Sequence, residues 1–507
     1  MEENGIIGFI TNSSYIDGNA MDGMRKELLK EFNDIFIIDL KGQIRRRTKE
    51  QAKIEGGNVF DIMTGVAIIL LVKNKSLKAN GNLYYSNIGD YLSKSDKLKK
   101  LSEWHSIETI YNNHEFKKII PNKKGDWINQ RNSNFNSLIK LGDKKQKDGL
   151  FTDYTGGIKT GRDAWAWNFS KKMVVKATSN SIDFYESNLG NTTVYDKVSK
   201  EISWTRSLKQ QFEKEKHIKF DPDRIYLGMY RPFVKKYVYY GKEMVDRQYQ
   251  MAKVMPKNNS KNRMISLSNK TEGKPLTSLA VNVIPDVNLF AGGSQNLPEY
   301  FYDSLGRYSA YNNKIVNDEL KIVSKDDVLP FVYGILHSVD YEKKYALDLA
   351  KEFPRIANVK DKDKFINIGK ELMELHINYE KVPVYDKVEI SYMGKPVYRV
   401  KKMKFAKKRN SKGKLEKDKS TIIFNETLTI SNIPEKAYQY IVNGRSAIEW
   451  IMDQYQVKTD KKSGITDDPN DYGDDPKYIF NLLLRIINVS VQTVDLINQL
   501  PKLEIEE

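Results

Sequence analysis

The sequence predicts an α/β protein in which an incomplete Rossmann-like sheet is followed by a large mixed α+β region with a helical C-terminal part. Three observations lead to this fold class. At 507 residues, the chain is long enough for about two to four domains with a core in each. Its first 73 residues hold continuous apolar runs that alternate with a helical pattern. From about residue 146 the pattern changes to short strands and helices with frequent aromatic side chains.

Three apolar runs near the N-terminus, residues 6–11, 34–40 and 66–72, are predicted to be strands. Between the first two, residues 22–32 carry apolar side chains at helical spacing. Strands that are apolar throughout belong to sheets covered on both faces. Because three strands with one or two helices cannot provide that cover, we expect this α/β unit to be incomplete.

The rest of the chain divides by composition. Residues 76–145 are polar and rich in Lys and Asn, and we interpret them as a connecting segment. Beyond them, helical spacing of apolar residues predicts helices at 326–353, 365–379, 447–455 and 478–500. Helices of this kind form a scaffold more often than a recognition surface.

Lysine and arginine outnumber aspartate and glutamate, which gives a net charge of +17 and a pI near 9.3. This excess favours a polyanionic partner, because each phosphate that is neutralised releases counterions. Part of the excess has a simpler origin, since AT-rich genomes raise the content of Lys, Asn and Ile. The charge therefore suggests nucleic-acid binding without establishing it.

Cysteine is absent, which excludes disulfides and thiolate zinc sites and suits a reducing cytoplasm. No cationic leader precedes a cleavable apolar core, and the longest apolar run, Val66 to Val72, is too short to span a bilayer. We therefore expect a cytoplasmic protein with no membrane partner. The five histidines form no ligand pair such as H-x-x-x-H, so no metal site is expected, and His337 and His376 are interpreted as structural.

The stretch from Gly157 to Asn168 combines glycines, cations, a carboxylate, two indoles and an amide. Glycine lets backbone approach a ligand closely, and Lys and Arg can reach phosphate or a guanine edge. The candidate DNA-binding residues here are Lys159, Thr160, Arg162 and Asp163. An equally compatible alternative is a glycine-bounded turn that enters a strand, with the two tryptophans on alternate faces and at least one in the core.

Basic side chains next to tyrosines form a second group of candidate DNA-binding residues: Arg231, Lys235, Lys236 and Arg247. Arg can be bidentate to guanine, and Tyr hydroxyls contact phosphate. Arg231 also precedes Pro232, which biases its backbone toward an extended conformation. The alternative is structural, since half-buried tyrosines stack on cations at many protein surfaces.

Two further basic clusters are candidates for phosphate contacts. Arg45, Arg46 and Arg47 lie in the loop between the second and third predicted strands, on the edge where such sheets bind ligands. Residues 401–419 carry ten lysines and arginines around a hairpin turn predicted at 410–414. For both clusters a solvated loop is the alternative, and for the hairpin the two interpretations carry equal weight.

Four segments carry a resemblance to a known family: 154–170; 230–233 followed by 247–250; 331–338 followed by Tyr341; and 440–446 through 468–471. They resemble the C-terminal specificity domain of the single-polypeptide type I (type ISP) restriction-modification enzymes. Each segment is a weak signal alone, but their order and spacing over roughly 350 residues are specific. The resemblance covers nearly the whole chain.

The resemblance implies a domain organisation. Residues 1–75 are expected to be the distal strands of an adenine-specific class I methyltransferase core, 76–145 the connecting segment, and 146–507 the target recognition domain. In that family an aromatic residue in the loop before the last strands receives the extruded target base. Phe60 is the candidate by position, and the alternative is a phenylalanine of the core.

Two elements of the family's methyltransferase core are missing from this sequence. No glycine-rich loop for S-adenosylmethionine follows a strand near the N-terminus. The nearest match to an Asn-Pro-Pro-Tyr-type catalytic motif, residues 467–472, lacks the second proline and is interpreted as an acidic turn. We therefore expect this chain to hold no catalytic residue and no cofactor by itself, and not to methylate DNA alone.

The resemblance implies sequence-specific recognition of double-stranded DNA that positions a target adenine for S-adenosylmethionine-dependent methylation. That cofactor, with the ATP and Mg²⁺ of the family's translocase, is expected on an upstream methyltransferase and helicase-nuclease portion, in cis or as a separate chain. Two alternatives stay open. One is a free-standing, non-catalytic DNA-binding specificity subunit, and the other is an unspecific polyanion or RNA binder.

Overall fold

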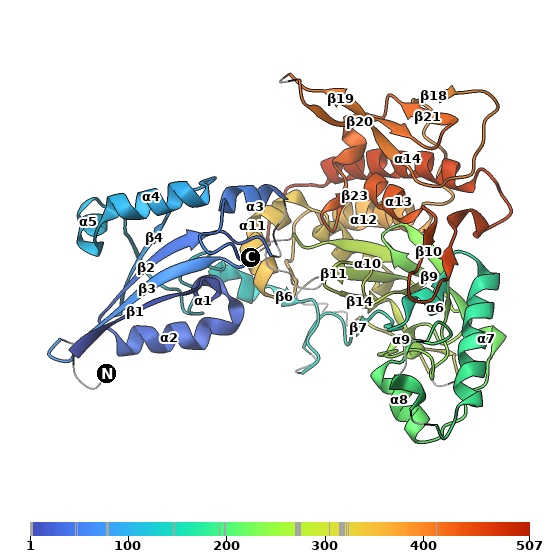
Figure 1. The fold of residues 1–507 in the computed structure, drawn as a ribbon, viewed down its shortest axis with the longest axis horizontal. Helices are drawn as coiled ribbons and strands as arrows, with labels where there is room; N and C mark the ends of the chain where they lie inside the picture. Colours follow the sequence, from blue (N-terminus) through green and yellow to red (C-terminus); the bar gives the residue numbers. More distant parts are fainter. Residues whose placement is uncertain are drawn as a thin grey trace. The chain divides into compact units, whose positions relative to one another are not determined.

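The computed structural model describes residues 4–506 except 46, 48, 78–80, 146–147, 192, 197–198, 269–274, 304, 314–319, 321, 323 and 412. The chain forms two compact units, whose elements are labelled in Figure 1. The N-terminal unit contains residues 1–137, 270–275 and 345–352, and the C-terminal unit contains residues 138–269, 276–344 and 353–507. The architecture is mixed α/β with several small sheets, in agreement with the predicted class.

A five-stranded sheet with the order β1-β3-β2-β4-β5 forms the centre of the N-terminal unit. Its strands are β1 (Asn4–Asn12), β2 (Asp34–Lys41), β3 (Val66–Asn74), β4 (Asn82–Asn87) and β5 (Lys117–Ile119). β3 lies between β1 and β2 and runs antiparallel to both, whereas β4 is parallel to β2. The sheet is therefore mixed rather than parallel. Residues 76–145, expected to be a connection, also supply two of its strands.

Helices cover this sheet unevenly. They are α1 (Ser14–Asp17), α2 (Asp22–Glu31), α3 (Lys49–Glu55), α4 (Lys94–Trp104) and α5 (Ile107–Asn112). On one face, buried side chains of β2 and β3 pack against Tyr15, Ile16 and Trp127. On the other face, Trp104 of α4 and Ile110 of α5 cover the region around β2. The core of this unit therefore lies under its central strands.

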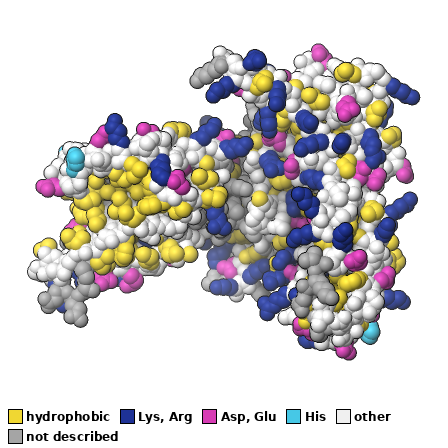
Figure 2. Space-filling model, viewed as in Figure 1, with side chains coloured by type: hydrophobic (Ala, Val, Ile, Leu, Met, Phe, Trp, Pro, Cys, Tyr) yellow, Lys and Arg dark blue, Asp and Glu magenta, His cyan; other side chains and the backbone are white. Residues whose placement is uncertain are grey.

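β1 is left largely uncovered. Among the described residues it pairs only with β3, and the side chains of Ile6, Phe9 and Ile10 are 70%, 55% and 60% exposed. Figure 2 shows apolar side chains gathered on the N-terminal unit. The composition of β1 is that of an interior strand, but its surroundings are those of an edge strand.

Three four-stranded sheets organise the described part of the C-terminal unit, with the orders β13-β9-β10-β8, β12-β11-β14-β7 and β18-β21-β20-β19. The first contains β8 (Trp167–Asn168), β9 (Ile225–Arg231), β10 (Val234–Tyr239) and β13 (Ile284–Pro285). The second contains β7 (Thr155–Gly156), β11 (Met264–Ser268), β12 (Ser278–Val281) and β14 (Ser294–Pro298). The third contains β18 (Glu389–Tyr392), β19 (Lys404–Arg409), β20 (Leu415–Ile423) and β21 (Leu428–Ser431).

Smaller sheets and helices complete the C-terminal unit. The two-stranded sheets pair β6 (Ile139–Lys140) with β17 (Arg355–Ile356), β15 (Tyr300–Tyr302) with β16 (Tyr308–Tyr311), β22 (Ile441–Val442) with β23 (Arg445–Ser446), and β24 (Lys458–Thr459) with β25 (Thr466–Asp467). The helices are α6 (Asp163–Ala166), α7 (Lys171–Ser187), α8 (Arg206–Glu213), α9 (Met251–Val254), α10 (Lys325–Leu336), α12 (Lys362–Ile377), α13 (Ala447–Gln454) and α14 (Tyr478–Gln499). α11 (Val339–Lys351) is non-helical at Tyr345, where the chain passes from one unit to the other.

α10 and α12 approach each other closely because each has a glycine at the contact. A Cβ atom on Gly369 would lie 2.0 Å from the carbonyl oxygen of Pro330, and one on Gly334 would lie 2.4 Å from that of Phe365. Both positions therefore require glycine. Within the described part of the chain, α14 is the one helix that is long and apolar enough to cross a membrane by length and composition. Since 67% of its most apolar window is buried inside the protein, it behaves as a core helix.

Candidate nucleic-acid interface

The backbone of the segment 157–168 is fixed by neighbouring elements. A Cβ atom on Gly157 would lie 2.5 Å from the carbonyl oxygen of Asp286, so this close approach requires glycine. Lys159 forms an antiparallel bridge with Arg247, with N···O distances of 2.9 and 3.0 Å. The bridge brings two of the predicted DNA-binding residues together although they are distant in the sequence.

Both tryptophans of this segment belong to the core. Trp165 and Trp167 are 8% and 3% exposed, and the indole N–H of Trp165 donates to the carbonyl oxygen of Lys200 at 2.9 Å. The two residues do not alternate along one strand, because Trp165 lies in α6 and Trp167 begins β8. The structural interpretation of this segment is therefore correct for the tryptophans.

Arg162 supports the fold and does not face solvent. It is 3% exposed, and its guanidinium donates to the carbonyl oxygens of Ser203 and Met244 and to Oγ1 of Thr205, at 3.2, 2.7 and 2.8 Å. Burial lowers the pKa of Arg162 to about 10, although the Asp246 carboxylate acts in the opposite direction. In this conformation the guanidinium is used by protein acceptors, which favours a structural role, and the DNA contact predicted for Arg162 stays a prediction.

Thr160 and Asp163 are engaged with each other. Thr160 is 1% exposed, and its hydroxyl donates to Oδ1 of Asp163 at 2.5 Å. The hydroxyl of Tyr230 donates to Oδ2 of the same carboxylate at 3.2 Å. Asp163 thus ties α6 to β9, and both predicted residues have a structural role in this conformation.

Lys235 and Lys236 are also buried, at 7% and 5% exposure, because β10 is an interior strand of its sheet. The Nζ atom of Lys235 lies 2.5 Å from Oε2 of Glu380, and that of Lys236 lies 2.5 Å from Oδ2 of Asp467. Burial lowers the pKa of Lys236, and Asp467 offsets part of this effect. These ion pairs favour a structural role for the two lysines, and their predicted DNA contacts stay a prediction.

Arg231 is partly buried and already paired. Its side chain is 19% exposed, and Nη1 lies 2.9 Å from Oδ1 of Asp286, which is 2% exposed. Burial and the nearby Asp163 carboxylate raise the pKa of Asp286 to about 7, while Arg231 lowers it. Its bonds to Asp286 and to the carbonyl oxygen of Tyr230 both come from Nη1, so a DNA contact by Arg231 would use its remaining donors or replace Asp286 as partner.

Lys159 and Arg247 keep their side chains at the surface. The Lys159 side chain is 47% exposed, with Nζ 3.3 Å from Oδ2 of Asp246, and Arg247 is exposed. Tyr249 is 48% exposed and has a φ of 49°, a left-handed conformation that is costly for a bulky residue. We call Lys159, Arg247 and Tyr249 the loop surface. Cations beside an exposed aromatic ring suit contacts with phosphate and with a base.

The N-terminal unit presents an apolar loop between β2 and β3. Phe60, Ile62 and Met63 are 54%, 45% and 59% exposed. Buried Asn58 holds this loop, since its Oδ1 accepts the backbone N–H groups of Phe60 and Ile62 at 2.9 and 3.3 Å, and its amide donates to two backbone carbonyls. The exposure of Phe60 excludes the alternative of a core phenylalanine.

The predicted arginine cluster lies next to this apolar loop. The backbone N–H of Arg45 donates to the carbonyl oxygen of Met63 at 2.9 Å, and its side chain is exposed. The Arg47 side chain is 33% exposed, with Nη2 3.4 Å from Oε1 of Glu55. Arg46 lies outside the described residues. Arg45 is therefore the better placed of the two described arginines for an outside partner.

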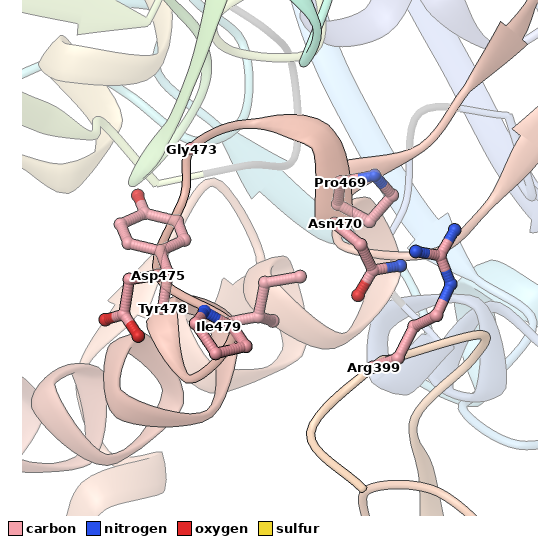
Figure 3. A pocket seen from close by; sticks show the side chains of 8 residues that line it. Arg399, Pro469, Asn470, Gly473, Asp475, Tyr478 and Ile479 are labelled. Atoms are coloured by element: carbon pink, nitrogen blue, oxygen red, sulfur yellow. The ribbon is translucent and has the colours of Figure 1, made fainter.

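The segment 467–472 is a structural turn. Oδ1 of Asp468 accepts the backbone N–H of Asn470 at 2.9 Å. The side-chain amide of Asn470 donates to the carbonyl oxygen of Val400 at 2.8 Å, and its Oδ1 accepts the backbone N–H of Val400 at 2.9 Å. Arg399 forms an ion pair with Asp468. Figure 3 shows the side chains of Arg399 and Asn470 on one wall of a small adjoining pocket of about 110 Å³. These contacts agree with the acidic-turn interpretation.

Metal-ligand clusters and glycine-rich cofactor loops each have a recognisable geometry. No group of three or more His, Asp and Glu side chains among the described residues could hold a metal ion. In the described N-terminal sheet, β1 leads through Ser13 directly into α1, and β2 ends in a turn with a single glycine, Gly42. Neither strand end resembles the glycine-rich loop that cradles a nucleotide-like cofactor.

The comparison with protein families decides the classification. The family model of the type ISP C-terminal specificity domain matches residues 149–482. The chain belongs to the type ISP restriction-modification family. The part that matches the type ISP model contains all three residues of the loop surface and most of the C-terminal unit. No curated protein matches the chain.

Three solved complexes with DNA, two of them of type ISP enzymes, resemble the chain over nearly its whole length. LlaBIII, an ATP-dependent type ISP enzyme solved bound to DNA, is 55% identical with a TM-score of 0.88, covering 100% of this chain and 33% of LlaBIII. A nuclease-deletion mutant of the type ISP enzyme LlaGI in complex with a DNA substrate mimic is 42% identical with a TM-score of 0.84, covering 99% and 39%. The DrdV-DNA complex is 28% identical with a TM-score of 0.82, covering 99% and 51%. The chain thus spans about a third of the length of LlaBIII.

Proposed function

We propose that this chain recognises a specific sequence in double-stranded DNA on behalf of a type ISP restriction-modification system. The observation that carries the proposal is the match to the type ISP specificity domain over residues 149–482, together with 55% identity to an enzyme that was solved bound to DNA. The net charge of +17 supports a polyanionic partner. The loop surface supports contacts with both phosphate and base in the same region.

We further propose that this recognition positions a target adenine for methylation. The exposed Phe60 loop supports this step, because a flipped base needs an aromatic or apolar surface to receive it. Arg45, exposed beside that loop, has the charge to contact the adjacent backbone. The S-adenosylmethionine site and the catalytic motif belong in this proposal to another part of the enzyme, as do ATP and Mg²⁺.

Selection of randomised duplex DNA on the purified chain, at about 0.15 M salt, tests the proposed function. We expect one enriched asymmetric site of several base pairs. Random duplex or RNA that competes as well as the enriched site would contradict sequence-specific recognition and favour an unspecific polyanion binder.

Replacing Arg247 with alanine is expected to weaken binding to the enriched site by about 1–3 kcal/mol, because an exposed arginine on the loop surface loses a charge-assisted contact. Affinity is measured by fluorescence anisotropy with the enriched duplex. Lys242→Ala is the matched control, since Lys242 is an exposed cation in the same loop region. Equal affinities for Arg247→Ala and the unchanged protein would remove the loop surface from the interface.

The exposed edge of the N-terminal sheet favours an enzyme part over a free-standing specificity subunit. A subunit that acts alone would leave Ile6, Phe9 and Ile10 in water at 70%, 55% and 60% exposure, on a strand whose outer edge has no partner among the described residues. Such edges associate with other chains unless they are covered. The upstream portion of a type ISP enzyme is the partner that the relatives' greater length supports.

Changing Ile6 and Ile10 to aspartate is expected to abolish a complex between this chain and a separately expressed upstream portion. Two buried, unpaired carboxylates would cost far more than the apolar contact contributes. Complex formation is measured by size-exclusion chromatography with light scattering. Leu98→Asp is the control, since Leu98 is 48% exposed on α4 of the same unit. A complex that survives the β1 changes would contradict pairing at this edge.

A further inference from the structure

The third four-stranded sheet of the C-terminal unit ends in a two-stranded ribbon. β19 is its edge strand and pairs with β20 in the register Arg409↔Leu415, Lys408↔Glu416, Lys407↔Lys417 and Ala406↔Asp418. The turn lies at 410–414, as predicted from the sequence, with Lys412 outside the described residues. Figure 1 shows the ribbon extending away from α14. Two backbone hydrogen bonds close the turn: the N–H of Asn410 donates to the carbonyl oxygen of Lys414, and the N–H of Gly413 donates to that of Asn410.

The two faces of this ribbon differ in charge. Side chains alternate between faces along a strand, so Lys407, Arg409 and Lys417 share one face. We call this the cationic face. The opposite face is mixed, since it carries Lys404 and Lys408 together with Glu416 and Asp418. The sequence alone shows that this region carries ten lysines and arginines, but it does not show which face of the ribbon each of them occupies.

Side-chain contacts agree with this assignment. On the mixed face, Nζ of Lys408 lies 3.7 Å from Oδ1 of Asp418, so the charges of that face partly neutralise each other. On the cationic face, Nζ of Lys417 lies 5.8 Å from the centre of the Phe405 ring. Among the described residues, no carboxylate forms an ion pair with Lys407, Arg409 or Lys417, and all three are exposed.

The cationic face is costly to the isolated protein. Lys407 and Lys417 are directly opposite each other, and like charges in that position destabilise a pair of strands. A partner that supplies a row of negative charges removes this cost. The phosphates of duplex DNA form such a row, and the major groove admits a two-stranded antiparallel ribbon.

We propose that the cationic face of the β19–β20 ribbon binds the sugar-phosphate backbone of duplex DNA. This inference rests on the proposed function and adds a second contact to it. The loop surface supplies contacts that depend on sequence, whereas the ribbon supplies affinity that does not. Its contribution is therefore the same for the enriched site and for random duplex.

The double variant Lys407→Ala/Lys417→Ala tests the inference against Lys404→Ala/Lys408→Ala, which removes the same charge from the mixed face. Binding is measured with the full chain as a function of salt. For the first variant, the plot of log Kobs against log[salt] is expected to be shallower by about 1.8, because each phosphate contact contributes about 0.9 to the slope. Affinity falls by the same factor on the enriched and random duplexes. The second variant is expected to keep the slope of the unchanged protein.

An unchanged slope in the first variant would overturn the inference, and so would an equal change in both variants, since net charge would then explain the effect. Polyglutamate that competes as well as duplex DNA would also overturn it in favour of an acidic protein partner. Failure of the proposed function is distinguishable, because it appears as a lack of sequence enrichment in the unchanged protein. Thermal melting of both variants is the control for folding, and neither is expected to melt lower, because the changed side chains are exposed.

Discussion

Replacing Arg162 with alanine is expected to destabilise the C-terminal unit by about 3–5 kcal/mol. The guanidinium donates to Ser203, Met244 and Thr205, and the residue is only 3% exposed. Its removal breaks three hydrogen bonds, one of them to the buried carbonyl oxygen of Met244, and a buried acceptor left without a donor costs about 1–3 kcal/mol. The loss is measured by urea unfolding followed through tryptophan fluorescence, because buried Trp165 lies in the adjacent helical turn.

Arg247→Ala is the matched control, because Arg247 is an exposed arginine close to the same segment. It should change stability by less than about 0.5 kcal/mol while it weakens DNA binding. Arg162→Lys should lie between the two in stability, since a single ammonium replaces only part of the fork of donors. If Arg162→Ala kept full stability and lost preference at one base pair, the prediction that Arg162 reads a base would be supported instead.

The contrast between Arg162 and Arg247 shows what the sequence could not provide. Both residues lie near aromatic side chains and glycines, so local composition predicts the same DNA-binding role for both. The burial of Lys235 and Lys236 depends on Glu380 and Asp467, which are 145 and 231 residues away. Local pattern cannot identify partners at such separations. The left-handed backbone that presents Tyr249 also depends on its tertiary surroundings.

The helices and strands could be predicted from the sequence more fully than the contacts of the candidate DNA-binding residues. The three apolar N-terminal runs form β1, β2 and β3, and the helices predicted at 365–379, 447–455 and 478–500 are α12, α13 and α14. Continuous apolar runs and long helical periods report burial directly. The predicted helix 326–353 is divided into α10 and α11, because α10 ends at Leu336, where the N–H of the next residue, His337, donates to the carbonyl oxygen of Gly334 and closes the helix. Strands β4 and β5 were missed because they are short and polar.

A buried histidine joins the three helices that brace the C-terminal unit. His376 of α12 is 0% exposed, with Nδ1 2.6 Å from the Tyr333 hydroxyl of α10 and Nε2 2.9 Å from Oγ1 of Thr493 in α14. The Tyr333 hydroxyl accepts from the N–H of Ala280, and the Thr493 hydroxyl donates to the carbonyl oxygen of Val489. These bonds fix the directions: Tyr333 donates to Nδ1, and Nε2–H donates to Thr493. Only a neutral imidazole fits this chain of hydrogen bonds.

The C-terminal unit is therefore expected to lose stability as the pH falls below 6.5. Burial, with a smaller effect from His337, lowers the pKa of His376 well below its usual 6.5. The unfolded state then binds the proton that the folded state excludes. This contribution is nearly complete well above pH 6.5, and as the pH falls below 6.5 the loss approaches about 1.4 kcal/mol per pH unit for this one histidine. Urea unfolding between pH 7 and pH 5 measures the slope.

The test is the difference between the protein and a His376→Gln variant, because other groups titrate in the same range. Burial also lowers the pKa of His337, to about 4, which adds to the loss, whereas the raised pKa of Asp286, about 7, opposes it. Glutamine cannot be protonated, but its amide can accept from Tyr333 and donate to Thr493. Near pH 5 the difference between the two slopes should approach about 1.4 kcal/mol per pH unit, with the variant's slope the smaller. Equal slopes would mean that His376 takes up its proton without disturbing the three helices, and that its neutral form is not required by the fold.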